Sequence, residues 1–199
     1  NAKVYVNGVL QVANKVMHAE SGLYYNGINQ NHKSVFYVES AEDLRKAAAY
    51  FAGQTHSNEA NYVTIELLTN INLAGQDWTP WDVMWITLNA HGHKISNLNS
   101  NLFGYAGAVK VNDLTLENVI SSGNQVGTFA AGTEGSTFNN CVLTGINKVT
   151  YVDAGKEDNG IGAISGITIN SNNNVTISAG AKVTLEYNDI TSQNTAFSD

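Results

Sequence analysis

The feature that most constrains the fold is a five-residue pattern that occurs three times. Asn-Asp-Leu-Thr-Leu at 112–116 returns as Asn-Asn-Cys-Val-Leu at 139–143, 27 residues later, and as Asn-Asn-Val-Thr-Ile at 173–177, a further 34 residues on. Alternating apolar residues indicate strands, and strands that repeat at such intervals are typical of a solenoid. We therefore predict that the apolar positions stack in two inward-facing columns, formed by Leu114, Leu116, Cys141, Leu143, Val175 and Ile177.

Asparagine is unusually abundant, with 27 residues beside 18 glycines and a single proline, whereas only 14% of the residues are charged. An average soluble domain has about 25% charged residues, and long helices are rich in Ala, Glu, Lys, Leu and Arg, so a coiled coil is excluded. A net charge of only -7 and many β-branched residues argue against disorder. We expect asparagines at equivalent turns to adopt the left-handed backbone region and to hydrogen-bond between repeats.

The predicted fold class is all-β, a right-handed parallel β-helix (solenoid) of about five coils with an N-terminal capping helix. Strand and turn patterns fill the chain from Tyr62 to Tyr187. Two parts are expected. Residues 1–38 form N-terminal strands and turns, with a hairpin turn at Asn7-Gly8. Residues 39–199 form the β-helix domain, which includes the capping helix.

Residues 40–53 are the predicted helix. Ser40 is placed to be the N-cap, and acidic residues follow it in the first turn, where they favour the helix dipole. Apolar residues recur with helical spacing, and Gly53 is the stop signal. Because an exposed sheet edge must be covered, we expect the helix to lie across the N-terminal end of the β-structure, with Leu44, Ala48 and Phe51 facing it.

The charge balance narrows the partners. Ten basic residues stand against 17 acidic ones, the pI is near 5.1, and no basic patch or long apolar run is visible. We therefore predict neither nucleic-acid binding nor membrane insertion. Cys141 is the single cysteine, and its inward position makes it a core residue rather than a nucleophile. The sequence does not define an oligomeric state.

Residues 35–150 resemble a known family. The motif residues are Thr-Asn-Ile-Asn-Leu at 69–73, Asp-Trp-Thr-Pro at 77–80, Leu-Asn-Ala-His-Gly-His-Lys-Ile-Ser-Asn-Leu at 88–98, Leu-Phe-Gly at 102–104 and Asn-Asp-Leu-Thr-Leu-Glu-Asn at 112–118. In this order they resemble the secreted or surface right-handed parallel β-helix proteins of gut Bacteroidetes, of adhesin type and pectate-lyase-like architecture. The resemblance implies an extracellular or cell-surface location, with a signal peptide removed, and most such members have no established chemistry.

The alternative function is a polysaccharide lyase or glycoside hydrolase that acts on an extended glycan. Lyases of this architecture hold Ca²⁺ and use a basic residue, often arginine, for proton abstraction. The one arginine, Arg45, lies on the predicted helix, whereas Lys94 and Lys110 fall in the coils without a carboxylate cluster. Hydrolases of this architecture place two or three acids on one strand face, and no predicted coil strand has acids two residues apart. A non-catalytic role is therefore favoured.

Aromatic side chains are the candidate ligand-binding residues. Flat rings stack on the apolar faces of sugars, and indole N–H groups can bind hydroxyls. We take Trp81, Trp85, Trp78 and Tyr62 as the candidate glycan site. The alternative is that these side chains fill the core beneath the helix. That alternative is favoured for Trp78, whereas Trp81 is the residue to test first, because it lies in a turn between coils.

Two features could bind a metal, although the predicted function requires no cofactor. His91 and His93 are two residues apart, which on a strand directs both side chains to one face. Asp153, Glu157 and Asp158 form an acidic loop whose oxygens could hold Ca²⁺. The alternatives are a histidine that hydrogen-bonds within the stack and an acidic loop that is simply solvated.

These observations favour a non-catalytic surface or secreted β-helix protein in adhesion or in glycan or protein recognition. The sheet faces would serve as an extended platform, with binding groups presented on a rigid support. Its partner would be a glycan or a surface protein. A further alternative is that the chain is the scaffold part of a longer surface protein.

Overall fold

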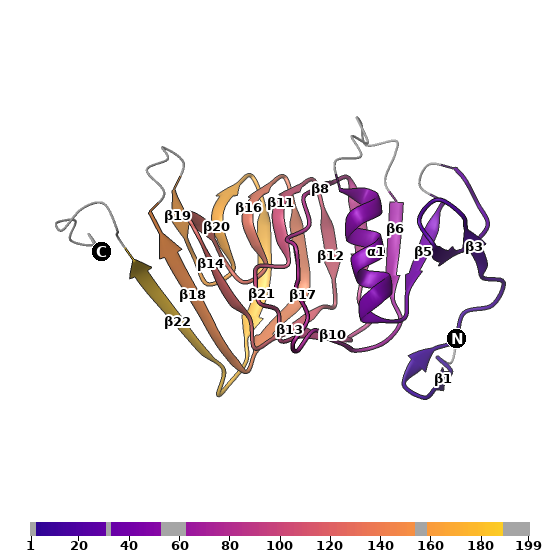
Figure 1. Cartoon of the computed structure of the whole chain (residues 1–199), viewed down its shortest axis with the longest axis horizontal. Helices are drawn as coiled ribbons and strands as arrows, with labels where there is room; N and C mark the ends of the chain where they lie inside the picture. Colours follow the sequence, from indigo (N-terminus) through magenta and orange to yellow (C-terminus); the bar gives the residue numbers. More distant parts are fainter. Residues whose placement is uncertain (1–2, 31–32, 53–62, 154–158, 189–199) are drawn as a thin grey trace.

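The computed structural model describes residues 3–30, 33–52, 63–153 and 159–188, and this part of the chain consists mainly of β-strands with one helix. The strands form several sheets, and most neighbouring strands run parallel (Figure 1). The prediction of a mostly β fold with parallel strands is therefore confirmed.

The first sheet has 11 strands and runs through most of the molecule. Its central strand, β17, pairs with β12 through its first half and with β13 through its second half. In pairing order its strands are β3 (Val16–His18), β4 (Leu23–Tyr25), β5 (Val35–Val38), β6 (Val63–Leu67), β9 (Ile86–Asn89), β12 (Lys110–Asn112), β17 (Thr137–Thr144), β13 (Thr115–Glu117), β10 (Lys94–Ser96) and β7 (Ile71–Asn72), with β21 (Asn172–Ile177) also paired to β17.

Two further parallel sheets and two strand pairs complete the β-structure. The second sheet contains β8 (Val83–Met84), β11 (Phe103–Gly107), β16 (Ala130–Glu134) and β20 (Ser165–Ile169). The third sheet contains β14 (Ile120–Gly123), β18 (Ile146–Val152) and β22 (Lys182–Asn188). The pairs are β15 (Gln125–Val126) with β19 (Gly160–Ile161), which is parallel, and β1 (Tyr5–Val6) with β2 (Val9–Leu10), which is antiparallel.

The strand register confirms the repeat that the sequence predicted. Leu116 lies opposite Leu143, and Leu143 lies opposite Ile177 on the next strand. The backbone N–H of Val142 donates to the carbonyl of Leu114 over 2.9 Å, which places 112–116 and 139–143 on adjacent parallel strands. Leu114, Leu116, Cys141 and Leu143 are fully buried, as expected.

The repeat predicts that the Ile177 side chain is buried with the other apolar residues of its column. That prediction of burial is wrong, because the side chain is 48% exposed. Ile177 lies on β21, which pairs with β17 on one side and has no strand on its other side within the described residues. Burial in a parallel stack needs a neighbour on both sides. The pattern therefore predicts the column in which Ile177 lies but not its exposure.

Asparagine side chains link successive strands, as predicted. Asn112 Nδ2 donates to Asn89 Oδ1 over 2.8 Å, and Asn139 Nδ2 donates to Asn112 Oδ1 over 3.0 Å. A second run joins Asn97 to Asn72 over 2.8 Å. Other members of these turns adopt the left-handed backbone region that asparagine tolerates, at Asn97, Asn118 and Asn140. Amide ladders of this kind explain the asparagine content.

The helix α1 (Ala41–Phe51) begins at the predicted N-cap, where Ser40 Oγ accepts a hydrogen bond from the backbone N–H of Asp43 over 3.1 Å. Its apolar face is buried as the spacing predicted, through Leu44, Ala47, Ala48 and Phe51. Ala52 is the C-cap, and the predicted stop at Gly53 lies outside the described residues.

The helix connects β5 to β6, which are parallel neighbours in the first sheet. The helix packs beside the first sheet, near the end of that sheet that is N-terminal in sequence (Figure 1). It does not cover that end alone, because β5, β4 and β3 extend the first sheet beyond β6. The strands of residues 1–38 are thus hydrogen-bonded to those that follow residue 39. The hairpin at Asn7-Gly8 forms as predicted.

Candidate functional site

Two of the predicted glycan-binding tryptophans belong to the core. Trp78 is buried, and its Nε1 donates to the carbonyls of Asn101 and Leu102, each over 3.1 Å. Trp81 is only 1% exposed, and its ring centroid lies 5.8 Å from that of Phe103. The core interpretation of Trp78 therefore holds. The core alternative also holds for Trp81, which packs against Phe103 and presents no exposed ring to a glycan.

The other two candidate glycan-binding residues are Trp85 and Tyr62. Trp85 is half-buried, has a positive φ of 59°, and donates its backbone N–H to the Gly107 carbonyl over 3.0 Å. Tyr62 lies outside the described residues. The structure thus does not gather the four predicted aromatic residues on one exposed surface within the part of the chain that it describes.

The sequence interpretation missed an exposed aromatic side chain on the second sheet. Tyr105, on β11, is 39% exposed, and Met84, on the neighbouring strand β8, is exposed to a similar degree. In register, Tyr105 lies opposite Gly132 of β16, while Gly107 lies between Met84 and Glu134. We call this group, formed by Met84, Tyr105, Gly107, Gly132 and Glu134, the Tyr105 platform.

Two glycines leave room for the Tyr105 ring on the sheet. A Cβ added to Gly107 would lie 3.1 Å from Cε1 of Tyr105, although Gly107 is two residues further along the strand. The ring therefore leans along β11 rather than standing upright. A Cβ added to Gly132 would lie 3.7 Å from Cδ2 of the same ring. Glycine at position 107 therefore lets the ring approach the backbone closely, whereas a side-chain carbon at position 132 would meet the ring at an ordinary contact distance.

Hydrogen bonds fix Tyr105 at both ends. Its hydroxyl hydrogen-bonds the carboxylate of Glu134, and its backbone N–H donates to Asp82 Oδ1 over 2.7 Å. The hydrogen bond to Glu134, with help from burial and from the negative charge of Glu134, raises the pKa of Tyr105 to about 12. The platform is thus a positioned aromatic ring whose hydroxyl is held by the Glu134 carboxylate and whose backbone N–H is held by the Asp82 carboxylate.

Gly104 explains how Asp82 reaches the Tyr105 backbone. A Cβ on Gly104 would lie 2.2 Å from Asp82 Oδ1, so any other residue would displace that carboxylate. The sequence signal for the platform is therefore Gly-Tyr-Ala-Gly at 104–107, one aromatic residue bracketed by glycines within a strand.

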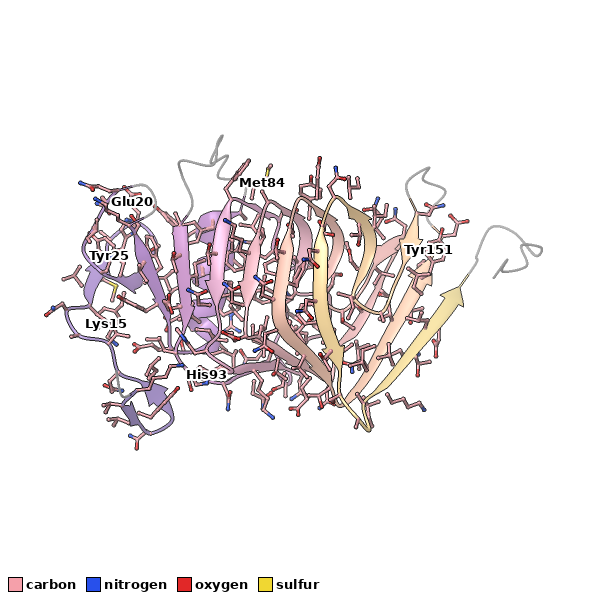
Figure 2. All side chains as sticks on the ribbon, turned by 180° about the vertical axis from the view of Figure 1, so that it is seen from behind. Lys15, Glu20, Tyr25, Met84, His93 and Tyr151 are labelled. Atoms are coloured by element: carbon pink, nitrogen blue, oxygen red, sulfur yellow. The ribbon has the colours of Figure 1, made fainter. Side chains whose placement is uncertain are left out.

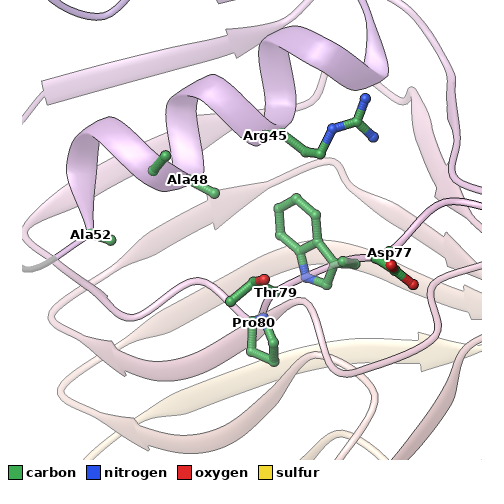
Figure 3. Close-up of a pocket in the computed structure, with 8 residues that line it drawn as sticks. Arg45, Ala48, Ala52, Asp77, Thr79 and Pro80 are labelled. Carbon is green, nitrogen blue, oxygen red and sulfur yellow. The ribbon is translucent and has the colours of Figure 1, made fainter.

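A second candidate site is a cavity of about 340 Å³ between α1 and the loop that carries Asp77, Thr79 and Pro80. Figure 3 shows Arg45 projecting from the helix on one side of it and Asp77 on the opposite side. Arg45 already donates to Gln76, and its Nη2 contacts Glu42 over 3.0 Å. The arginine considered as a lyase base therefore ties the helix to the following loop.

The two histidines do not share a strand face. His91 and Gly92 have φ values of 55° and 84°, so the chain turns between the two histidine side chains. His91 pairs with Glu66. His93, which is labelled in Figure 2, is buried, and its ring centroid lies 5.8 Å from that of Tyr5. Burial, followed by the nearby charges of His91 and Lys3, lowers the pKa of His93. The spacing argument was wrong because it assumed a strand.

Metal-ligand residues are not clustered in the part of the chain that the structure describes. No group of three or more His, Cys, Asp or Glu side chains there could hold a metal ion. Of the predicted Ca²⁺ ligands, Asp153 is half-buried after β18, and Glu157 and Asp158 lie outside the described residues. Cys141 is buried, which raises the pKa of its thiol to about 11, as suits a core residue.

Comparisons with known proteins do not point to a function for this chain. No protein-family model, curated protein or solved structure matches this chain. Within the described residues, no helix is long and apolar enough to cross a membrane.

Proposed function

We propose that the chain is a right-handed parallel β-helix of about five coils, with α1 and the strands β5, β4 and β3 together at its N-terminal end. The support is the register: from β6 to β9, β12, β17 and β21, each strand of the first sheet pairs in parallel with one from the next repeat. The second and third sheets are ordered in the same way. This architecture agrees with the resemblance to secreted or surface β-helix proteins of gut Bacteroidetes, and we propose an extracellular or cell-surface location on that resemblance.

We further propose that the protein recognises glycans without cleaving them, in adhesion or surface attachment. The observation that carries this proposal is the Tyr105 platform. An exposed ring that already leans on the sheet, with its hydroxyl bound to Glu134 and its backbone N–H bound to Asp82, loses little conformational entropy when a ligand stacks on it. A sugar would place its apolar face on the ring and its hydroxyls near Glu134, whose carboxylate is a hydrogen-bond acceptor beside the hydroxyl of the ring.

The charge of the platform favours a neutral glycan. The Glu134 carboxylate contacts the hydroxyl of the ring, the Asp82 carboxylate contacts the backbone of the same residue, and the chain carries a net charge of -7. A polyanionic glycan would bring its carboxylates or sulfates close to these acids and would be repelled. Neutral polysaccharides carry hydroxyl donors that suit the same acceptors.

A glycoside hydrolase is the alternative function, and one observation favours it. The sequence has no acidic pair within a predicted coil strand, but the fold brings two carboxylates to Tyr105, that of Asp82 to its backbone N–H and that of Glu134 to its hydroxyl. Hydrolysis needs two carboxyl groups that flank the scissile bond. Both carboxylates here are engaged by Tyr105, which supports recognition over catalysis.

A glycan array combined with a reducing-end assay on the same polysaccharides tests the two functions. We expect weak binding to a neutral glycan and no new reducing ends. Since a stacked ring contributes about 1 kcal/mol by analogy with aromatic pairs, Tyr105→Ala should weaken binding several-fold. Tyr24→Ala, which removes a similarly exposed tyrosine from β4, is the matched control and should bind normally. New reducing ends that disappear in Glu134→Gln would support the hydrolase instead.

A further inference from the structure

The C-terminal end of the described stack leaves a long strand edge open. β22 is the outermost strand of the third sheet and pairs with β18 over all seven of its residues (Figure 1). No strand pairs with its other edge within the described residues. Such an edge offers a row of backbone donors and acceptors to another strand.

Apolar side chains at this end are also exposed. Leu185 on β22 is 51% exposed, although its register partner Val149 on β18 is fully buried. Ile177 on β21 and Ile169 on β20 are exposed to nearly the same degree. Ile177 and Leu185 each follow a fully buried register partner, Leu143 and Val149, so a further layer on the first and third sheets would bury them, whereas Ile169 follows the exposed Glu134 and faces outward. Exposed apolar side chains at the end of a stack are unusual for a surface that has no partner.

The charges on β22 select how a second strand can pair. Lys182 and Glu186 are exposed, lie four residues apart, and share one strand face with Thr184 between them. In an antiparallel pair centred on Thr184, Lys182 of each strand lies opposite Glu186 of the other, and Val183 lies opposite Leu185. The same sequence therefore complements itself in both charge and apolar contact.

We propose that this end is an interface between two copies of the chain, in which the β22 strands pair antiparallel across a two-fold axis through Thr184. Glu186 also contacts Lys148 of its own chain over 2.8 Å, so each acid would lie between two lysines. A two-fold interface closes on itself and leaves neither β22 edge free. The third sheets of both copies would join into one.

Disulfide trapping tests the register. Residues on the axis of an antiparallel pair lie directly opposite their own copies, about 4.5 to 5.5 Å apart between Cα atoms, which a disulfide can span. We expect Thr184→Cys to form a disulfide-linked dimer under mild oxidation. Cys141 is buried and should not compete. Ser122→Cys, an exposed position on β14 at the other side of the third sheet, is the matched control and should stay unlinked.

Charge reversal tests the contacts in solution by sedimentation velocity. Lys182→Glu sets like charges opposite each other at two places and should raise the dimer dissociation constant about ten-fold. Adding Glu186→Lys should recover most of that loss, whereas Lys33→Glu, in the N-terminal region, should change nothing. A chain that stays monomeric at every concentration overturns the proposal, and this result would follow if another part of the chain covered the edge. An open-ended oligomer in sedimentation velocity also overturns it. Equal crosslinking of Thr184→Cys and Ser122→Cys overturns it as well.

Discussion

Two aromatic side chains of this protein lie close together on one strand, but one is buried and the other is exposed. Phe103 and Tyr105 are two residues apart on β11, yet Phe103 packs against Trp81 in the core while Tyr105 is 39% exposed on the sheet surface. The opposing residues are equally different, with Ala130 facing Phe103 and Gly132 facing Tyr105. Whether an aromatic side chain is available to a ligand therefore depends on the residues against which it packs more than on its own type.

The largest expected effect is a loss of stability on substitution of Trp81, which is buried against Phe103. Trp81→Ala should lower the free energy of unfolding by about 3 to 5 kcal/mol, because it removes a fully buried indole and leaves a cavity beside Phe103. Urea unfolding measures this change. Trp81→Phe should cost much less, since it keeps a ring there and removes an Nε1 that has no hydrogen-bond partner among the described residues. Tyr105→Ala should change stability by less than about 1 kcal/mol. Equal losses for Trp81→Ala and Tyr105→Ala would break the comparison.

The next effect concerns the glycines beneath the exposed ring. Gly107→Ala should weaken glycan binding several-fold, because the new methyl group would lie 3.1 Å from the ring and 3.0 Å from Cγ of Met84. The nearby side-chain tips can move, so the protein should stay folded. Gly132→Ala is the matched control, because its methyl group meets the ring at an ordinary 3.7 Å. Calorimetric titration with a glycan from the array checks both variants, and equal binding by both would show that the ring position is not set by Gly107.

The ionisation of Tyr105 gives a smaller and direct test of the platform geometry. Its pKa is raised from 10.0 to about 12, so the hydrogen bond to Glu134 stabilises the fold below pH 10 and is lost as the pH rises through about 12. Glu134→Gln should lower the pKa of Tyr105 towards 10, because it removes the charged acceptor. Tyrosinate absorbance, compared between this variant and Tyr105→Phe, isolates the one titration. An unchanged titration in Glu134→Gln would remove Glu134 from the platform.

The smallest expected effect is that of Tyr105→Phe. The ring remains and only its hydroxyl is lost, so stacking should persist and glycan affinity should change by no more than about two-fold. The same calorimetric titration measures it. A loss as large as that of Tyr105→Ala would mean that the hydroxyl, rather than the ring face, contacts the glycan.

Several elements of the fold could be predicted because their causes are local. Ser40 caps the helix through the next turn of backbone, and asparagine turns depend on one residue's tolerance of positive φ. The repeat at 112–116 and 139–143 fixed the register, because equal spacing places equal residues on adjacent strands.

The candidate site could not be predicted in the same way, because its causes are not local. Trp81 is buried by contact with Phe103, 22 positions away, and no periodic pattern marks the turn that carries it. The Tyr105 ring lies over glycines from two strands, and the pairing of Tyr105 with Gly132 follows from the register alone. Ile177 looks like a core residue in sequence, and only the missing next strand exposes it within the described chain.

Glycans should bind on the Tyr105 platform and not at the buried tryptophans. Backbone amide chemical-shift mapping by NMR, with a bound oligosaccharide from the array, locates the binding surface. The largest shifts should cluster at Tyr105, Gly107, Gly132 and Glu134. Shifts that cluster instead around Arg45, Asp77 and Trp78, at the cavity beside α1, would contradict it.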